Sequence, residues 1–180
     1  MIIRRAKEKD IPEVLRLLSQ VLEIHASIRP DIFISGTTKY SAEELAEMFR
    51  DEKRPVYVAL EEETEGDDTQ DTKATLGSPI SGSSTLGSPI LGYCFCEFEE
   101  APDSVNIVPF TSIYIDDLCV DAGARGSHVG RSLFEYVKAE AKKLGCYEIT
   151  LNVWEGNDTA RIFYEKMGMH PKKTTMEYIL

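Results

Sequence analysis

Basic side chains are scarce in this sequence. Its 180 residues contain 20 lysines and arginines against 31 aspartates and glutamates, which gives a formal net charge of -11. Proteins that bind nucleic acid or anionic membranes electrostatically need a basic surface, so this charge balance argues against both kinds of partner. The excess of acid is explained most simply by solubility. It is also compatible with an acidic cavity that attracts a cationic amine.

Long apolar runs are missing as well. No run approaches the roughly 20 residues that a membrane-spanning helix requires. Residues 1–10 include basic side chains but no apolar stretch after them, which argues against a secretory signal peptide. We therefore expect a cytoplasmic protein without a membrane partner. The length and the 42% hydrophobic content suit one globular domain over residues 1–180.

Cysteine occurs only four times, at Cys94, Cys96, Cys119 and Cys146. No Cys-x-x-Cys pair and no nearby histidine pair gives the spacing of a zinc site, so we expect no bound metal. Cys94 and Cys96 are two residues apart in a strand-like stretch and should point to the same face. This pattern favours buried, reduced thiols.

Hydrophobic periodicity predicts an alternation of strands and helices. Asp10 with Glu13, and Ser41 with Glu44, have the spacing of helix capping boxes. Strands are expected at 2–5, 56–60, 91–99, 111–120, 148–153 and 174–180, and helices from 10 to about 25, from 41 onward, over 129–144 and over 159–167. This order predicts an α/β sandwich whose first half is mostly antiparallel.

Residues 61–88 differ in composition from the rest of the chain. The segment begins with an acidic run and continues into Ser, Gly, Pro and Thr-rich sequence, in which Thr75–Ile80 recurs as Thr85–Ile90. Two polar copies are too few for a solenoid. We interpret the segment as a flexible insert that lengthens a hairpin loop at the surface.

A glycine-bearing turn follows the strand at 111–120 and opens the next helix. Main-chain N–H groups at a helix start bind anions, and small residues let the backbone approach a ligand closely. The turn consists of Arg125, Gly126, Ser127, His128, Val129, Gly130 and Arg131. Its N–H groups and two arginines can bind a pyrophosphate. It lacks the Lys-Ser/Thr end of a P-loop and the three glycines of the dinucleotide fingerprint.

These residues resemble the signatures of the GNAT superfamily of acyl-CoA N-acyltransferases. The first signature is Arg/Gln-x-x-Gly-x-Gly/Ala, which Arg125 and Gly130 match while His128 stands at the middle glycine. The second, Asn-x-x-Ala-x-x-Phe-Tyr-x-x-x-Gly, is matched throughout, from Asn157 to Gly168. The resemblance implies the GNAT-type α/β fold, in which a mixed central sheet is flanked by helices.

The resemblance also implies how a cosubstrate would be held. Acetyl-CoA would lie between two splayed central strands, with main-chain bonds from Leu118, Cys119 and Val120 to its pantetheine arm. The N–H group of Leu118 would polarise the thioester carbonyl, as an oxyanion donor does. Asn157 would contact the cofactor or cap its helix, and the two roles are compatible.

Two side chains are candidates for proton chemistry. Tyr164 stands at the family's Phe-Tyr position and would donate a proton to the departing CoA thiolate; its alternative role is that of a core aromatic. Asp116 corresponds to the glutamate of a Tyr-Leu-Glu-Asp stretch in polyamine acetyltransferases, and would act as the base through a water. Asp116 and the adjacent Asp117 should point to opposite faces unless a bulge intervenes, and both could instead be solvated acids at a strand end.

We therefore interpret the chain as an N-acetyltransferase that moves an acetyl group from acetyl-CoA to a primary amine of a small molecule or protein by direct attack. The rival hypothesis is a non-catalytic acyl-CoA sensor. The resemblance implies a homodimer as the default assembly. Acceptor-lining residues are expected among His25, Arg29, Asp31 and Tyr40, with Pro109 and Phe110 opposite.

Overall fold

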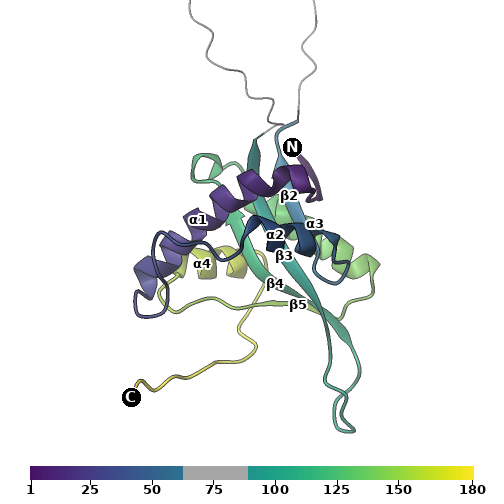
Figure 1. The fold of residues 1–180 in the computed structure, drawn as a ribbon. Coiled ribbons are helices and arrows are strands. Elements are labelled where there is room, and N and C mark those ends of the chain that lie inside the picture. Colours follow the sequence, from purple (N-terminus) through teal and green to yellow (C-terminus); the bar gives the residue numbers. More distant parts are fainter. Residues whose placement is uncertain (63–88) are drawn as a thin grey trace, which may run out of the picture.

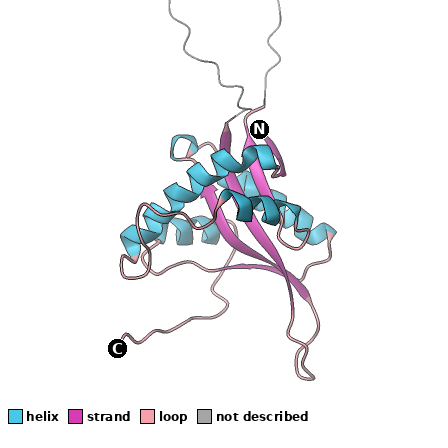
Figure 2. Ribbon diagram, in the orientation of Figure 1, coloured by secondary structure: helices cyan, strands magenta, loops and turns pink. Residues whose placement is uncertain are grey.

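The computed structural model describes residues 1–62 and 89–180. Five strands form one sheet in the order β1-β2-β3-β4-β5 (Figure 1). The strands are β1 (Ile2–Arg5), β2 (Val56–Leu60), β3 (Ile90–Glu100), β4 (Thr111–Val120) and β5 (Glu148–Leu151). The helices are α1 (Ile11–Ile28), α2 (Ala42–Arg50), α3 (Val129–Lys143) and α4 (Asp158–Lys166), all shown in Figure 2.

The sheet is mixed, and helices cover both of its faces. Neighbouring strands from β1 to β4 are antiparallel, whereas β4 and β5 are parallel. Helices α1 and α2 cover one face, and α3 covers the other (Figure 1). This confirms the predicted α/β architecture with an antiparallel first half. The predicted insert joins the paired strands β2 and β3, and its residues 63–88 lie outside the described part of the chain.

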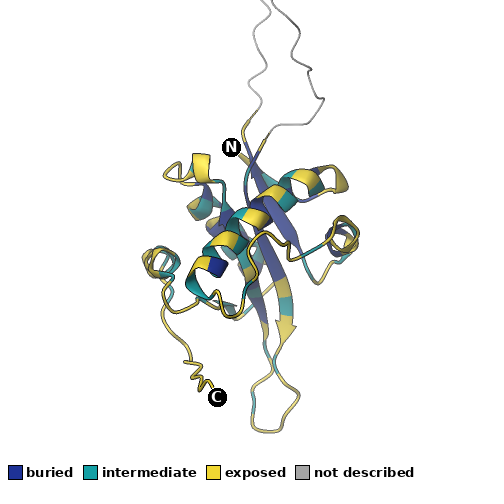
Figure 3. Ribbon diagram, turned by 60° about the vertical axis from the view of Figure 1, so that its left-hand side comes forward, coloured by how far each residue is buried: buried dark blue, intermediate teal, exposed yellow. Residues whose placement is uncertain are grey.

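Each face of the sheet has its own hydrophobic core, because the side chains of a strand alternate between faces. On the first face, α1 buries Val14, Leu17 and Leu18. On the second, α3 buries Val129, Leu133, Phe134, Val137 and Ala141 at helical spacing. Figure 3 shows the buried residues concentrated in the central strands. The cysteine prediction is confirmed for Cys94, Cys96 and Cys119, which are buried and free, whereas Cys146 is free but only partly buried. The sulfurs of Cys94 and Cys96 lie 3.7 Å apart.

The two predicted capping boxes have different outcomes. Ser41 caps α2 as predicted, because its side chain accepts from the Glu44 N–H while the Glu44 carboxylate accepts from the Ser41 N–H. Asp10 precedes α1 but makes no capping bond to that helix. Its carboxylate instead accepts from Arg4 and from the Lys7 N–H. The predicted cap was wrong because a cation from β1 reaches this carboxylate.

The predicted last strand at 174–180 is also wrong. Residues 167–180, all of which the structure describes, contain no strand or helix. Met176, Tyr178, Ile179 and Leu180 are exposed, and the segment is connected to the domain by the ion pair between Glu177 and Arg29. Alternating apolar residues give a strand propensity, but a strand also requires a neighbouring edge to pair with.

Candidate active site

An opening lies beside the second half of β4. Strand β5 pairs with β4 only from Ser112 to Ile115. Beyond Ile115, residues 117–120 of β4 continue to pair with β3 on the other side. Within the described residues, no strand pairs with the β5-side edge of 116–120. The main-chain groups on this edge are therefore available to a ligand.

The register of β3 and β4 shows which main-chain groups face the opening. The Asp121 N–H donates to the Leu91 carbonyl of the β3 side at 2.8 Å. Because antiparallel pairs alternate along a strand, the groups of Cys119 also face β3, whereas those of Leu118 and Val120 face the opening. The sequence predicted all three as main-chain ligands. Of these three residues, Leu118 and Val120 have main-chain groups that face the opening.

A bulge in β4 brings the two adjacent aspartates to one face. Phe95 of β3 is opposite Asp117, and the next residue of β3 is opposite Ile115, so Asp116 is the extra residue. Asp116 contacts Lys39 and Tyr40, which lie on the face covered by α1 and α2. The sequence predicted that both carboxylates can lie on one face only if a bulge intervenes. The structure has this bulge.

Asp117 is partly buried, and its carboxylate has an unusual environment. The hydroxyl of the fully buried Tyr93 donates to Asp117 Oδ2 at 2.9 Å. Burial raises the pKa of Asp117 to about 6, although Tyr93, the Lys39 charge and the Leu118 N–H all favour the ionised form. A carboxyl group with a pKa near 6 can accept a proton at neutral pH and release it again.

Asp116 is exposed and holds the ammonium group of Lys39. The distance between Lys39 Nζ and Asp116 Oδ2 is 2.7 Å, and the Tyr40 hydroxyl lies 3.3 Å from the same oxygen. The Lys39 nitrogen also lies 5.2 Å from the centre of the Tyr40 ring, within the range of a cation–π contact. Carboxylate, hydroxyl and ring together form a site for a primary ammonium group.

Tyr164 lies on the opposite face of the sheet, in α4. Its ring packs against Phe163 and Phe134, with centroid distances of 5.0 and 6.3 Å. Burial raises the pKa of its phenol, and the neighbouring Cys94 and Asp117 raise this pKa further. The phenol is therefore protonated at neutral pH and is a hydrogen-bond donor.

The turn before α3 has the geometry of an anion site. Gly126 has a φ of 86° and His128 a φ of 63°, and α3 begins at Val129. The N–H groups of the first helical turn have no acceptor within the helix and are free to bind a ligand. Gly130 packs closely against its neighbours, because a Cβ there would lie 3.3 Å from Val120 Cγ2 and 3.4 Å from Phe163 Cζ, so that the Val120 side chain would have to shift by a few tenths of an ångström. Both arginines of the turn are exposed.

His128 is strained at the position where the family signature has glycine. It is the one non-glycine residue with positive φ among the described residues. We expect His128→Gly to raise the free energy of unfolding by about 1 kcal/mol, because glycine adopts this conformation without a steric cost. Urea denaturation measures the change. His128→Ala is the matched control, since alanine retains the strain, and an equal gain in both variants would contradict the explanation.

Asn157 caps α4, since its side-chain oxygen accepts from the Ala160 N–H at 3.2 Å. This confirms the capping role. The carbonyl-type oxygen is engaged in this bond, so a contact with a cofactor would fall to the side-chain amide group. The cap fixes the start of the helix that carries Tyr164.

The end of α1 and the loop after β5 meet near the opening. His25 packs on Phe33, Phe33 packs edge-on against Trp154, and the Arg29 guanidinium lies 5.5 Å from the Trp154 ring centre. Arg29 is also paired with Asp31. His25, Arg29 and Asp31, which were predicted to line the acceptor site, are thus connected to one another through Phe33 and Trp154. Tyr40, the fourth residue predicted on this side, contacts Asp116 instead.

The expectation that Pro109 and Phe110 lie opposite these residues stays a prediction. The Phe110 ring packs against Tyr147, which directly precedes β5. Six residues of extended chain separate Phe110 from Asp116, which corresponds to about 20 Å.

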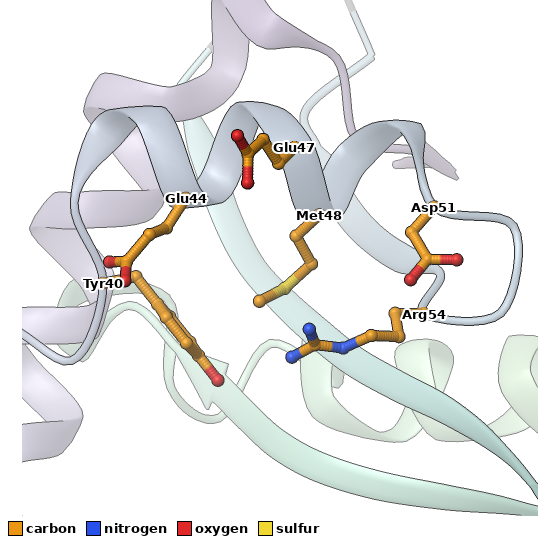
Figure 4. A pocket seen from close by; sticks show the side chains of 6 residues that line it. All are labelled: Tyr40, Glu44, Glu47, Met48, Asp51 and Arg54. Atoms are coloured by element: carbon orange, nitrogen blue, oxygen red, sulfur yellow. The ribbon is translucent and has the colours of Figure 1, made fainter.

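Two hollows lie on the α1 side of the site. The first, of about 290 Å³, lies under α2 and is lined by Tyr40, Glu44, Glu47, Met48, Asp51 and Arg54 (Figure 4). Three carboxylates and one guanidinium make its lining acidic. Tyr40 also touches Asp116, so this hollow adjoins the ammonium site. The second, of about 480 Å³, includes Arg16, Asp121 and Ser127 and adjoins the turn before α3.

Sequence reasoning missed Lys39 and Tyr93. Lys39 lies in an aperiodic segment, and its contact with Asp116 spans 77 positions of the chain. Tyr93 lies within the strand predicted at 91–99, and no local pattern indicates that its hydroxyl would bind Asp117. Contacts of this kind depend on strands and loops that are brought together by folding.

No helix within residues 1–62 and 89–180 has the length and apolar character needed to cross a membrane. In the same residues, no group of three His, Cys, Asp or Glu side chains is placed to hold a metal ion.

The sequence matches the model of the acetyltransferase (GNAT) family over residues 21–169. A mutant of the BH1408 protein from Bacillus halodurans is 31% identical with a TM-score of 0.83, covering 100% of this chain and 99% of that chain. An aminoglycoside acetyltransferase from an uncultured soil metagenomic sample is 20% identical with a TM-score of 0.66, covering 99% and 95% of the two chains. At that identity, the likeness shows the fold alone.

One curated relative also matches a part of the chain. Glucosamine 6-phosphate N-acetyltransferase from Arabidopsis thaliana is 35% identical over 63 residues, which is 35% of this chain and 40% of that protein. The match thus spans two fifths of the length of this relative.

Proposed function

Since the chain belongs to the acetyltransferase (GNAT) family, we propose that it transfers the acetyl group of acetyl-CoA to a primary amine by direct attack. The acceptor is the amine of a small molecule or of a protein, and the acidic surroundings favour a small cationic amine. The observation that supports this proposal most is the opening beside β4. Two carboxylates lie on one face of the sheet at the bulge, and the Tyr164 phenol lies on the other face.

In this proposal, the main chain holds acetyl-CoA. The N–H groups at the start of α3, together with Arg125 and Arg131, bind the pyrophosphate. Leu118 and Val120 offer N–H and carbonyl groups to the pantetheine arm at the open edge of β4. The Leu118 N–H, which favours the ionised form of Asp117 in the structure, donates instead to the thioester oxygen when acetyl-CoA is bound and stabilises the charge that develops there in the transition state.

The acceptor amine must lose its proton before it attacks, because an alkyl ammonium group has a pKa near 10. Asp116 and Tyr40 hold the ammonium group, in the position that Lys39 occupies in the structure. Asp116 accepts the proton through a water, and Asp117 is the second acceptor on the same face. When the C–S bond breaks, Tyr164 donates its proton to the CoA sulfur.

A thiol-release assay tests the proposed function. The panel consists of a diamine, a polyamine, an amino sugar, an aminoglycoside, free amino acids and an N-terminal peptide, each with acetyl-CoA. We expect CoA release with a cationic amine. Acetyl-CoA binding by calorimetry without CoA release for any acceptor would contradict transfer and favour the sensor hypothesis. Competition of ATP with acetyl-CoA would instead indicate a general nucleotide-phosphate site.

The pH dependence of the same reaction tests the role of Asp117. Because its pKa is raised to about 6, we expect kcat/KM to rise with pH through about 6, as the carboxylate forms. Asp117→Asn should remove this inflection. The raised pKa also predicts that the contribution of Asp117 to stability is complete below its ordinary pKa and is lost as pH rises through 6. An unchanged pH profile in the variant would exclude Asp117 as a proton acceptor.

A further inference from the structure

Lys39 brings a primary amine of the protein itself to the proposed acceptor site. Its ammonium nitrogen is 2.7 Å from Asp116 Oδ2, and the Tyr40 hydroxyl lies 3.3 Å from the same oxygen. The amine is thus held by the group that the proposed function assigns to the acceptor. Chemically, a lysine amine is the same kind of nucleophile as an external alkyl amine.

Lys39 is also close to the position of the reacting carbonyl. Asp116 precedes Leu118 by two residues, and strand residues rise by about 3.3 Å each, so the two main-chain positions are about 7 Å apart. The Lys39 side chain is 42% exposed and has a flexible four-carbon stem. Its segment, from 29 to 41, contains turns but no helix or strand. A reorientation of one side chain therefore brings the nitrogen to a thioester carbonyl bound at Leu118.

We propose that the protein acetylates its own Lys39 within one molecule, an inference that rests on the proposed function. The Lys39 ammonium releases one proton to Asp116, and the nitrogen lone pair then forms a C–N bond with the acetyl carbon. The C–S bond breaks, and the CoA sulfur takes a proton from Tyr164. The second proton lost by the nitrogen restores the Tyr164 phenol. The products are Nε-acetyl-Lys39, CoA thiol and one released proton.

The reaction changes the acceptor site. Acetylation removes the positive charge of Lys39, so its ion pair with Asp116 is lost. Asp116 and Tyr40 are then available to an external ammonium group. Conversely, an external primary amine competes with unmodified Lys39 for Asp116 and slows the self-acetylation.

The electrostatics of Lys39 predict a pH signature. Burial lowers the pKa of the ammonium group, but the hydrogen bond and the charge of Asp116 raise it more, so the net pKa is above its ordinary value. The free amine is therefore a minor species at neutral pH. As long as the pH is below that pKa, each unit by which the pH is raised should make self-acetylation about tenfold faster, because the fraction of free amine rises tenfold.

The experiment incubates the full chain with acetyl-CoA and follows the modification of individual lysines by peptide mass spectrometry. Lys138 is the matched internal comparator, because its side chain is 39% exposed and it is paired with Glu135 at 3.2 Å. We expect Lys39 to be acetylated at least about tenfold faster than Lys138, at a first-order rate that is independent of protein concentration. Equal rates at the two lysines, or a rate proportional to protein concentration, would overturn the proposal.

Variants separate an enzymatic step from chemical acetylation in solution. Asp116→Asn and Tyr164→Phe should slow the modification of Lys39 and leave that of Lys138 unchanged. Lys39→Arg should abolish the mass increase assigned to this position. If both lysines respond equally to these variants, or if neither responds, Lys39 is modified by solution chemistry and the proposal fails.

Two parallel measurements distinguish failure of this inference from failure of the proposed function. Calorimetry with acetyl-CoA and thiol release with external amines are recorded on the same preparation. Release of CoA with an external amine, while Lys39 is acetylated no faster than Lys138, overturns self-acetylation alone. Absence of acetyl-CoA binding overturns the proposed function and self-acetylation together.

Discussion

Replacement of Tyr164 by phenylalanine should lower kcat about 100-fold while acetyl-CoA still binds. A positioned general acid contributes a factor of this size or more to the rate. The phenol is protonated at neutral pH because burial and the neighbouring Asp117 raise its pKa, so it can donate throughout that range. Phenylalanine preserves the packing of the ring against Phe134 and Phe163.

A matched variant controls for the loss of a buried hydroxyl. Tyr57 is 6% exposed, and burial raises the pKa of its phenol too, but it packs against Tyr136 on α3 and not beside the open edge of β4. Tyr57→Phe should leave kcat within about twofold of the unmodified protein. Steady-state kinetics and calorimetry with CoA measure both variants. Unchanged turnover in Tyr164→Phe would show that another group protonates the sulfur.

The second large effect is on stability, and it concerns the ion pair between Arg4 and Asp10. Two guanidinium nitrogens of Arg4 lie 2.7 and 2.9 Å from the carboxylate oxygens, and the Lys7 N–H donates at 2.8 Å. The Asp10 side chain is 6% exposed. Asp10→Ala should lower the free energy of unfolding by about 3 kcal/mol, because the guanidinium loses its carboxylate partner and the Lys7 N–H loses its acceptor.

The pH dependence of stability provides a second signature of Asp10. Burial disfavours its carboxylate, but the bonds from Arg4 and Lys7 outweigh this and hold its pKa below the ordinary value. The contribution of Asp10 is therefore complete above the ordinary pKa near 4 and is lost as pH falls through its folded-state pKa. Asp10→Ala should have a correspondingly flatter stability profile in acid.

The exposed pair of Glu8 and Arg50 provides the control for Asp10. Both of these side chains are more than half exposed, so Glu8→Ala should change the free energy of unfolding by less than about 0.5 kcal/mol. Urea denaturation of the two variants under identical conditions makes the comparison. A loss of equal size in both would show that burial of the Asp10 pair has no special role.

Most of the secondary structure was predictable because its signals are local. The apolar spacing of α1 and α3, the capping box of Ser41 and the alternation in β3 each lie within a few residues of one another. The end of α1 was underestimated by three residues, since its last turn is stabilised through contacts with other segments. The strand expected at 174–180 failed for a related reason: the alternation of apolar residues was present, but the segment does not pair with an edge of the sheet.

The sequence by itself determined the α/β class, the order of the elements before residue 168, the glycine-bearing turn before α3 and the helix that carries Tyr164. These features depend on periodicity, on glycine and on caps, which act over short stretches of chain. Only the tertiary structure decided that a bulge turns Asp116 and Asp117 to one face, that β4 has an open edge, and that Lys39 reaches Asp116. Those outcomes depend on the register of neighbouring strands and on contacts between distant segments, and no local pattern encodes either.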